Sequence, residues 1–126
     1  MPTWKKRKKK TGIDSKAAKD LLMFSLLSFV PRNMIALEHR FHPPRRWRFD
    51  YAIPHPDYRI AVEFNGSVWT QGRHTRGQGY INDREKINQA QIDGWLVLEL
   101  TSEMVKSGKA YEMIQQAIQS RKGGEE

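Results

Sequence analysis

The chain of 126 residues contains no cysteine, which excludes a disulfide framework, a thiol nucleophile and a cysteine-ligated zinc site. Long apolar runs are also lacking. The longest, LLMFSLLSFV at residues 21–30, is shorter than the about 20 residues that a membrane-spanning helix needs. A basic start can belong to a secretory signal, but here IDSKAAKD separates it from the apolar run and adds two acids. We therefore expect a cytoplasmic protein with no membrane partner.

Acidic residues are fewer than basic ones in this chain. The chain has 22 Lys and Arg against 14 Asp and Glu, a formal net charge of +8. Most of the excess lies in the block KKRKKK at residues 5–10, and such blocks are typically disordered arms that bind nucleic acid through its phosphates. A solubilising or localising tail is the alternative. We expect six side chains of this arm to bind DNA without sequence preference: Lys5, Lys6, Arg7, Lys8, Lys9 and Lys10.

The length suits one modest domain, without internal repeats or a linker. We expect residues 1–13 to be a disordered basic arm, residues 14–121 a single domain, and residues 122–126 a frayed end. Asp14–Ser15 offers an N-cap for an apolar-periodic helix that Pro31 stops or kinks. Residues 34–41, MIALEHRF, are predicted to continue this helix or to form a second helical piece.

The pattern changes to strands after residue 46. Aromatic residues alternate with charged ones at 47–51, PHPD at 54–57 is turn chemistry, and 58–64 forms a second apolar run. These segments predict an antiparallel hairpin. SVWT at 67–70 is a candidate for a short third strand.

The second half alternates helix and strand. Residues 80–93 are predicted to be a helix capped by Gly94, residues 95–100 a strand, and residues 101–120 a closing helix with a break at Gly108. A strand–helix–strand unit favours a parallel pair of strands. The predicted fold is therefore α/β, a small mixed β-sheet flanked by helices.

Two carboxylates stand inside the predicted hairpin. Asp50 and Glu63 lie at similar distances on either side of the turn, and cross-strand neighbours have Cβ atoms within about 5.5 Å of each other. Mg²⁺ prefers oxygen ligands and is often held by one or two carboxylates together with waters and a phosphate. We predict a Mg²⁺ site, which Mn²⁺ would also occupy, formed by Asp50, Glu63 and the backbone carbonyl of Phe64.

Other residues suit the remaining parts of a phosphodiester-cleaving site. Lys86 would supply an ammonium near the phosphate, and Glu38 would bind the metal or its waters from the N-terminal helical segment. In the glycine-rich loop GRHTRGQG, Arg73, His74 and Arg76 are predicted to grip the DNA backbone.

Four segments in order carry a family resemblance: WRFDYAIP, IAVEFNG, NDREKINQAQ and GWLVLEL. Over roughly residues 34–105 they resemble the PD-(D/E)XK nuclease superfamily, especially small branches related to very-short-patch repair endonucleases and to phage- or bacteria-encoded homing-type nucleases. The resemblance implies a restriction-endonuclease-like core of the order α-β-β-(β)-α-β-α, with Asp50 and Glu63 as metal ligands and Glu38 as the helix acid. The family's acid-x-lysine triplet reads Glu63-Phe64-Asn65 here, so the usual lysine is missing. In several branches a residue on the following helix takes its role, and Lys86 is placed for that.

Each candidate also has a purely structural interpretation. The alternatives are Asp50 paired with Arg46 or Arg48, Glu63 paired with a neighbouring cation, Lys86 paired with Asp83, and Glu38 in solvent. The predicted function is a Mg²⁺-dependent DNA endonuclease that is selective for DNA structure, either a Holliday-junction resolvase of phage type or a mismatch-directed nicking enzyme. A homodimer on branched DNA, with each subunit nicking one strand, fits the resolvase. The alternatives are a catalytically inactive DNA-binding module on the same fold and an RNA-binding ribosome-associated protein, and the latter leaves the paired carboxylates unexplained.

Overall fold

A computed structural model describes the backbone of residues 3–66 and 77–123 and the side chains of residues 15–66 and 77–122. Its centre is one sheet in the order β1-β2-β3-β4, formed by Ala36–Arg40, Arg48–Ile53, Ile60–Asn65 and Leu96–Thr101. The first three strands pair antiparallel, and β3 pairs parallel with β4. The predicted α/β class, mixed sheet, hairpin and parallel pair are thus confirmed.

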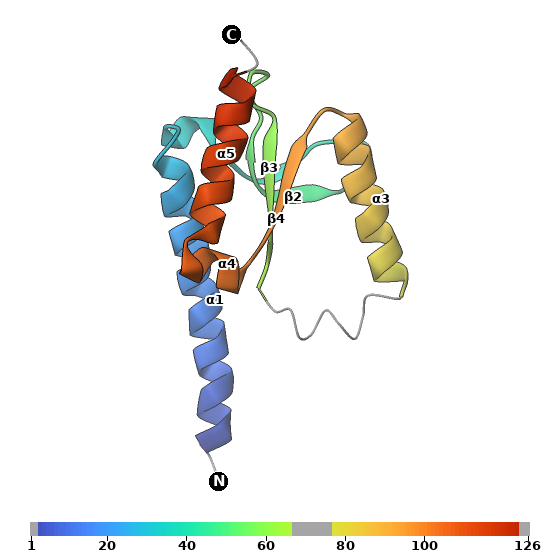
Figure 1. The fold of residues 1–126 in the computed structure, drawn as a ribbon. Helices are drawn as coiled ribbons and strands as arrows, with labels where there is room; N and C mark the ends of the chain where they lie inside the picture. The colour runs from blue at the N-terminus through green and yellow to red at the C-terminus, as the bar shows by residue number, and fades with distance from the viewer. Residues whose placement is uncertain (1–2, 67–76, 124–126) are drawn as a thin grey trace.

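Three helices cover one face of the sheet (Figure 1). They are α1 (Thr3–Leu27), α4 (Ser102–Ser107) and α5 (Lys109–Gly123). In α1 the buried residues Ala18, Leu22 and Leu26 recur every fourth position, so one stripe of the helix faces the core. Burial of each large apolar side chain contributes about 1.5–3 kcal/mol. The predicted break at Gly108 is confirmed, because this residue has φ +89 and separates α4 from α5.

One helix, α3 (Gln78–Ile92), covers the opposite face (Figure 1). Its buried Ala90 packs in a second cluster with Trp95 and with residues of β2 and β3. Gly94 follows the helix with φ +93, and its N–H donates to the carbonyl of Gln91. The predicted glycine cap is therefore confirmed, and it turns the chain directly into β4.

The helix predicted at residues 34–41 is wrong. A 3₁₀ turn at Arg32–Met34 follows Pro31, and the next residues form the edge strand β1. Leu37 and His39 pair with Tyr51 and Phe49 of β2, so pairing with a distant strand overrides the helix propensity of MIALEHRF. Glu38 is consequently a strand residue and not a helix acid.

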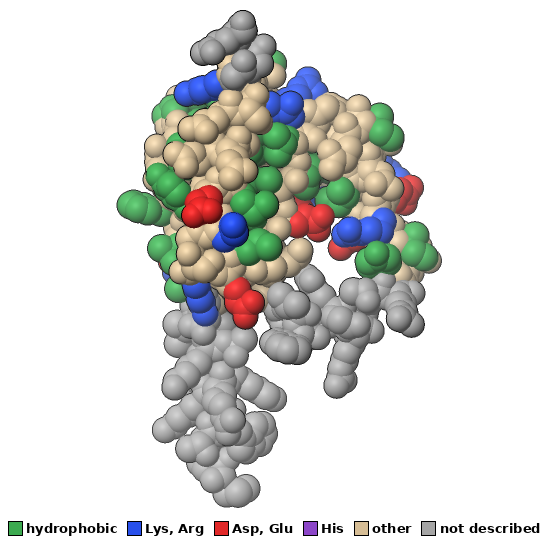
Figure 2. Space-filling model, in the orientation of Figure 1, with side chains coloured by type: hydrophobic (Ala, Val, Ile, Leu, Met, Phe, Trp, Pro, Cys, Tyr) green, Lys and Arg blue, Asp and Glu red, His purple; other side chains and the backbone are tan. Residues whose placement is uncertain are grey.

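The first helix begins earlier than its predicted cap. The backbone of residues 3–13 is helical, where we expected an arm without regular structure, and lysine and arginine are good helix formers. The candidate strand at 67–70 lies outside the described residues. Within the described parts of the chain, no helix combines the length and the apolar content needed to cross a membrane. Acidic and basic side chains both lie on the face of the molecule that Figure 2 shows.

Candidate active site

Asp50 and Glu63 lie where β2 and β3 stop pairing through their backbones. The ladder ends at the pair Tyr51–Val62. Beyond it, side chains replace backbone partners: the Asp50 N–H donates to Glu63 Oε2 at 3.0 Å, and the Phe64 N–H donates to Asp50 Oδ2 at 2.8 Å. Each carboxylate thus holds the backbone of the opposite strand, and the two acids are fixed next to each other. The predicted hairpin brings them together as expected.

The strand β2 changes face at Asp50. Residues two apart in a regular strand point to the same side, yet Phe49 packs in the cluster on the α3 side and Tyr51 in the cluster on the α1 side. The alternation is therefore broken at Asp50, which lies between them. This irregularity explains why the Asp50 carboxylate reaches sideways to the backbone of β3.

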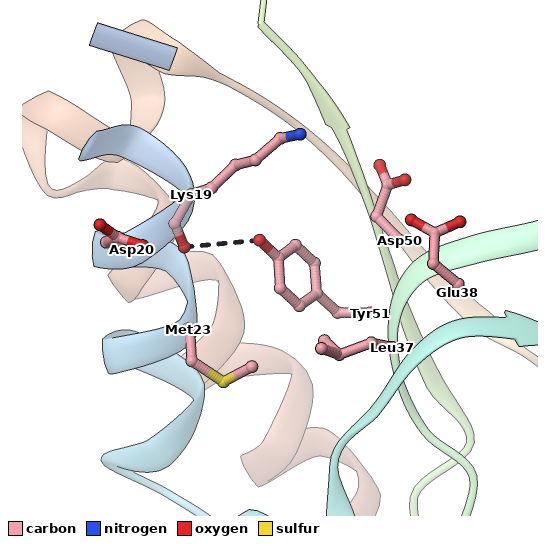
Figure 3. A pocket seen from close by; sticks show the side chains of 7 residues that line it. All are labelled: Lys19, Asp20, Met23, Leu37, Glu38, Asp50 and Tyr51. Carbon is pink, nitrogen blue, oxygen red and sulfur yellow. Dashed lines mark hydrogen bonds between the residues drawn. The ribbon is translucent and has the colours of Figure 1, made fainter. Parts of the chain in front are cut away.

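Glu38 lies opposite Asp50 on the neighbouring strand, between the pairs Leu37–Tyr51 and His39–Phe49. Its φ of +49 is a left-handed conformation, which costs a residue with a side chain on the order of 1–3 kcal/mol. Figure 3 shows the carboxylates of Glu38 and Asp50 side by side. The structure thus places the predicted Glu38 beside the predicted Asp50, at a backbone position that costs stability.

A hollow of about 320 Å³ opens beside these two acids, and α1 forms its other wall. It is lined by Lys19, Asp20, Met23, Leu37, Glu38, Asp50 and Tyr51. The Tyr51 hydroxyl donates to the Lys19 carbonyl at 3.4 Å (Figure 3). Burial raises the pKa of Tyr51, and the negative charges of Asp50, Asp20 and Glu38 raise it further. Three acids and one lysine line the same hollow.

Sequence reasoning missed the contribution of α1 to this hollow. The Lys19 ammonium extends toward Asp50, whereas the Asp20 side chain points away from it (Figure 3). Asp20 instead lies 3.4 Å from Lys16 one turn earlier. No local spacing connects Lys19 with Asp50, because only the packing of α1 on the sheet brings them near each other.

Lys86 reaches the paired carboxylates from α3. Its Nζ donates to Glu63 Oε1 and to the Arg48 carbonyl, both at 2.6 Å, and both ionic side chains are mostly buried. Within the described residues no ion pair joins Lys86 to Asp83, so the structure brings this lysine to the predicted site.

The environment of Glu63 disfavours its charge. Burial raises the pKa of the Glu63 carboxyl, the bond to Lys86 and its positive charge oppose this, and the charge of Asp50 adds to the increase. The net direction is upward. An acid of this kind gains from a nearby cation, because a second positive charge offsets the desolvation of its ionised form.

The sequence left open that Asp50 and Glu63 only form ion pairs with neighbouring cations, and the structure answers differently for the two residues. Glu63 does pair with a neighbouring cation, Lys86. Among the described residues, no ion pair joins Asp50 to Arg46 or Arg48, and Asp50 Oδ2 accepts a backbone N–H instead.

Other predicted residues lie outside what the structure describes. Arg73, His74 and Arg76 belong to the segment 67–76. The backbone of residues 5–10 forms part of α1, and the side chains of Lys5, Lys6, Arg7, Lys8, Lys9 and Lys10 are not among those described. Their roles in DNA binding stay predictions.

The residues present fit a metal that keeps most of its waters. In the described part of the chain, no three His, Asp or Glu side chains form a ready metal cage. Mg²⁺ does not need one, because one or two carboxylates, waters and substrate phosphate commonly complete its shell. Asp50 and Glu63 offer such a pair, since a carboxylate oxygen that accepts one hydrogen bond keeps a second lone pair.

No protein-family model, curated protein sequence or solved structure matches the chain. The resemblance to the PD-(D/E)XK nucleases therefore stays a prediction, and function is inferred from the geometry of the site itself.

Proposed function

We propose that this protein is a Mg²⁺-dependent DNA endonuclease with a restriction-endonuclease-like core, which hydrolyses phosphodiester bonds in DNA of particular structure. The single observation that carries the proposal is the arrangement of Asp50, Glu63 and Lys86. Two carboxylates stand together where two strands part, and a lysine from a separate helix lies 2.6 Å from one of them. This combination supports phosphodiester hydrolysis because a metal held by the carboxylates would polarise the phosphate, and the ammonium would stabilise the negative charge that develops on it.

Asp50 and Glu63, with the backbone carbonyl of Phe64, would hold Mg²⁺ or Mn²⁺. When bound, the ion supplies Lewis acidity and a more acidic water. Lys86 is oriented by its bonds to Glu63 and to the Arg48 carbonyl. Its ammonium would stabilise the negative charge that develops at the phosphate. Lys86 would thus take the role of the lysine that Asn65 replaces in the triplet.

Glu38 would assist from the other side of Asp50. Its position across β1 and β2 and its strained φ support a role in holding the metal or its waters. Glu38 and Asp50 also line the same hollow of about 320 Å³, so their negative charges lie on one side of it. Lys19, on the far wall of the hollow, would balance part of that negative charge.

A catalytically inactive DNA-binding module is the second candidate. One observation favours it: both Glu63 oxygens and the Lys86 ammonium already have partners within the protein. A purely structural ion pair would have the same contacts. In that case DNA binding would be independent of Mg²⁺, and the DNA would remain intact.

The test offers the protein a labelled four-way junction, a plain duplex, a mismatched duplex and single-stranded DNA, each with Mg²⁺ and with chelator. Symmetric paired cuts near the junction point identify a resolvase acting as a dimer, and nicks beside the mismatch identify a repair nickase. Asp50→Asn keeps the shape and the hydrogen-bond acceptor of the side chain, whereas Asp57→Asn makes the same change at an exposed turn position. We expect only the first to abolish cleavage. Binding without cleavage on all four substrates would favour the inactive module.

A further inference from the structure

The connection between β1 and β2 is a strongly basic surface loop. Residues 40–48 read RFHPPRRWR and include no acid. We call this segment the arginine loop. All four of its arginines are exposed: Arg40, Arg45, Arg46 and Arg48. Within the described residues, Arg46 and Arg48 make no side-chain ion pair, so their charges are available to an external partner.

An aromatic stack anchors the arginine loop to the core. Phe49 is fully buried, and the ring of Phe41 stacks on it with centroids 4.1 Å apart and an interplanar angle of 8°. Trp47 lies on the other end of this stack, 6.0 Å from Phe41 at 14°. The Arg45 guanidinium lies 3.7 Å above the Trp47 ring. The loop therefore presents its arginines from a packed base.

Polar contacts fix the arginine loop further. Arg40 donates to the carbonyls of Pro44 and Arg45, which closes the loop on itself. His42 Nδ1 lies 2.7 Å from Asp93 Oδ2, beyond the end of α3, and Arg45 lies 3.5 Å from Glu85. A surface that is ordered before binding loses less conformational entropy when a ligand arrives.

The arginine loop adjoins the proposed active site directly. The Arg48 carbonyl accepts a hydrogen bond from Lys86 Nζ, and the same ammonium pairs with Glu63. Arg48 also stands two residues before Asp50 on β2. The base of the arginine loop is thus bonded through its backbone to the Glu63–Lys86 pair of the proposed active site.

We propose that the arginine loop binds the phosphate backbone of the DNA strand that enters the active site, through Arg46 and Arg48 with Arg45 held flat on Trp47. This inference rests on the proposed function and adds a substrate-holding surface to it. Guanidinium groups match phosphate oxygens with paired hydrogen bonds, and phosphate contacts set the position of DNA without reading its sequence. An acidic protein partner would use the same charges without DNA, and in that case a loop variant without these charges would bind DNA as tightly as a control variant.

The test compares the double variant Arg46→Gln/Arg48→Gln with the control Lys109→Gln/Lys122→Gln. The control removes the same charge from exposed positions of α5, on the opposite face of the sheet. Affinity for a labelled duplex and a four-way junction is measured by fluorescence anisotropy with chelator present, over a series of salt concentrations. We expect the loop variant to lose about tenfold or more in affinity and to lower the salt slope by about two. Equal thermal melting of both variants would show that the fold is kept.

The outcomes separate this inference from the proposed function. Loss of affinity in the loop variant alone supports the arginine loop, even if the wild-type protein never cleaves DNA. A loop variant that binds DNA as tightly as the control, in a protein that cleaves with Mg²⁺, overturns the loop and leaves the nuclease. An unchanged salt slope would also overturn it, because phosphate contacts must release counterions.

Discussion

Glu63 and Lys86 form a 2.6 Å ion pair between β3 and α3, which brings a lysine from a separate helix next to the strand that carries Glu63. Both side chains are mostly buried. The lysine also bonds to the Arg48 carbonyl, so its ammonium is held by two partners on different strands. A cation so fixed beside the carboxylates suits charge stabilisation at a phosphate.

Replacement of Lys86 with methionine should slow cleavage by about a hundredfold or more, the usual cost of losing one preorganised charge-stabilising donor. DNA affinity should change little, because Lys86 is mostly buried. The decisive control is Asn65→Lys in the Lys86→Met background. Residues 63 and 65 share a face of β3, so the new lysine would stand at the usual family position. Partial recovery of the single-turnover rate is expected, and a double variant that cuts no faster than Lys86→Met would contradict this role of Lys86.

The loss of cleavage activity at low pH, the acid limb of the pH profile, should follow protonation of the Glu63 carboxylate. Burial raises the pKa of its carboxyl, and Lys86 opposes this increase. The ionised form is needed to hold a metal, so Mg²⁺ affinity and cleavage should fall, on acidification, at a higher pH than an ordinary glutamate would give. Lys86→Met should move this limb to still higher pH. A profile of metal affinity against pH checks both shifts, and a limb that stays in place in Lys86→Met would contradict the assignment to Glu63.

The same raised pKa has the opposite consequence for folding without metal. A raised pKa in the folded state means that stability is fully present below the ordinary glutamate pKa and is lost as the pH rises through the raised value. The free energy of unfolding of the wild type, compared with Glu63→Gln, should therefore decline across that window. Chemical denaturation at a series of pH values with chelator present measures it, and a difference that grows with pH would be the contrary result.

The Glu38 side chain should lower the stability of the fold through its positive φ, and its charge should contribute to cleavage. Glycine adopts positive φ without penalty, so Glu38→Gly should be more stable than Glu38→Ala by about 1 kcal/mol. Glu38→Gln leaves the backbone strain and removes only the charge, and we expect it to weaken Mg²⁺-dependent cleavage less than Asp50→Asn does. Thermal melts and cleavage rates of the three variants separate strain from charge. Full activity in Glu38→Gln would exclude Glu38 from the site.

The parts of the fold that sequence reasoning predicted are those encoded locally. The alternation around Asp50 and the turn at 54–57 predict the hairpin, and the apolar run at 95–100 with its capping glycine predicts β4. The hairpin register predicts that Asp50 and Glu63 stand opposite each other. It does not predict that β2 changes face at Asp50 or that the two carboxylates bond to the backbone of the opposite strand.

The parts that failed depend on contacts between distant segments. MIALEHRF has a helical pattern, and only pairing with β2 makes it a strand. Sequence reasoning considered Arg46 and Arg48 only as partners for Asp50, whereas in the fold both side chains are exposed and the Arg48 carbonyl bonds to Lys86. Lys19 was missed for the same reason, since α1 meets the sheet only in the folded chain.

The most direct test of the nuclease proposal is the single-turnover cleavage rate of a labelled four-way junction as a function of Mg²⁺ concentration, for the wild type, Asp50→Asn and Asp57→Asn. We predict that the cleavage rates of the wild type and of Asp57→Asn rise with Mg²⁺ concentration. The rate of Asp50→Asn should be at least about a hundredfold lower than that of the wild type at the same Mg²⁺ concentration. Cleavage that persists in Asp50→Asn, or a wild type that binds the junction and never cuts it, would contradict the proposal.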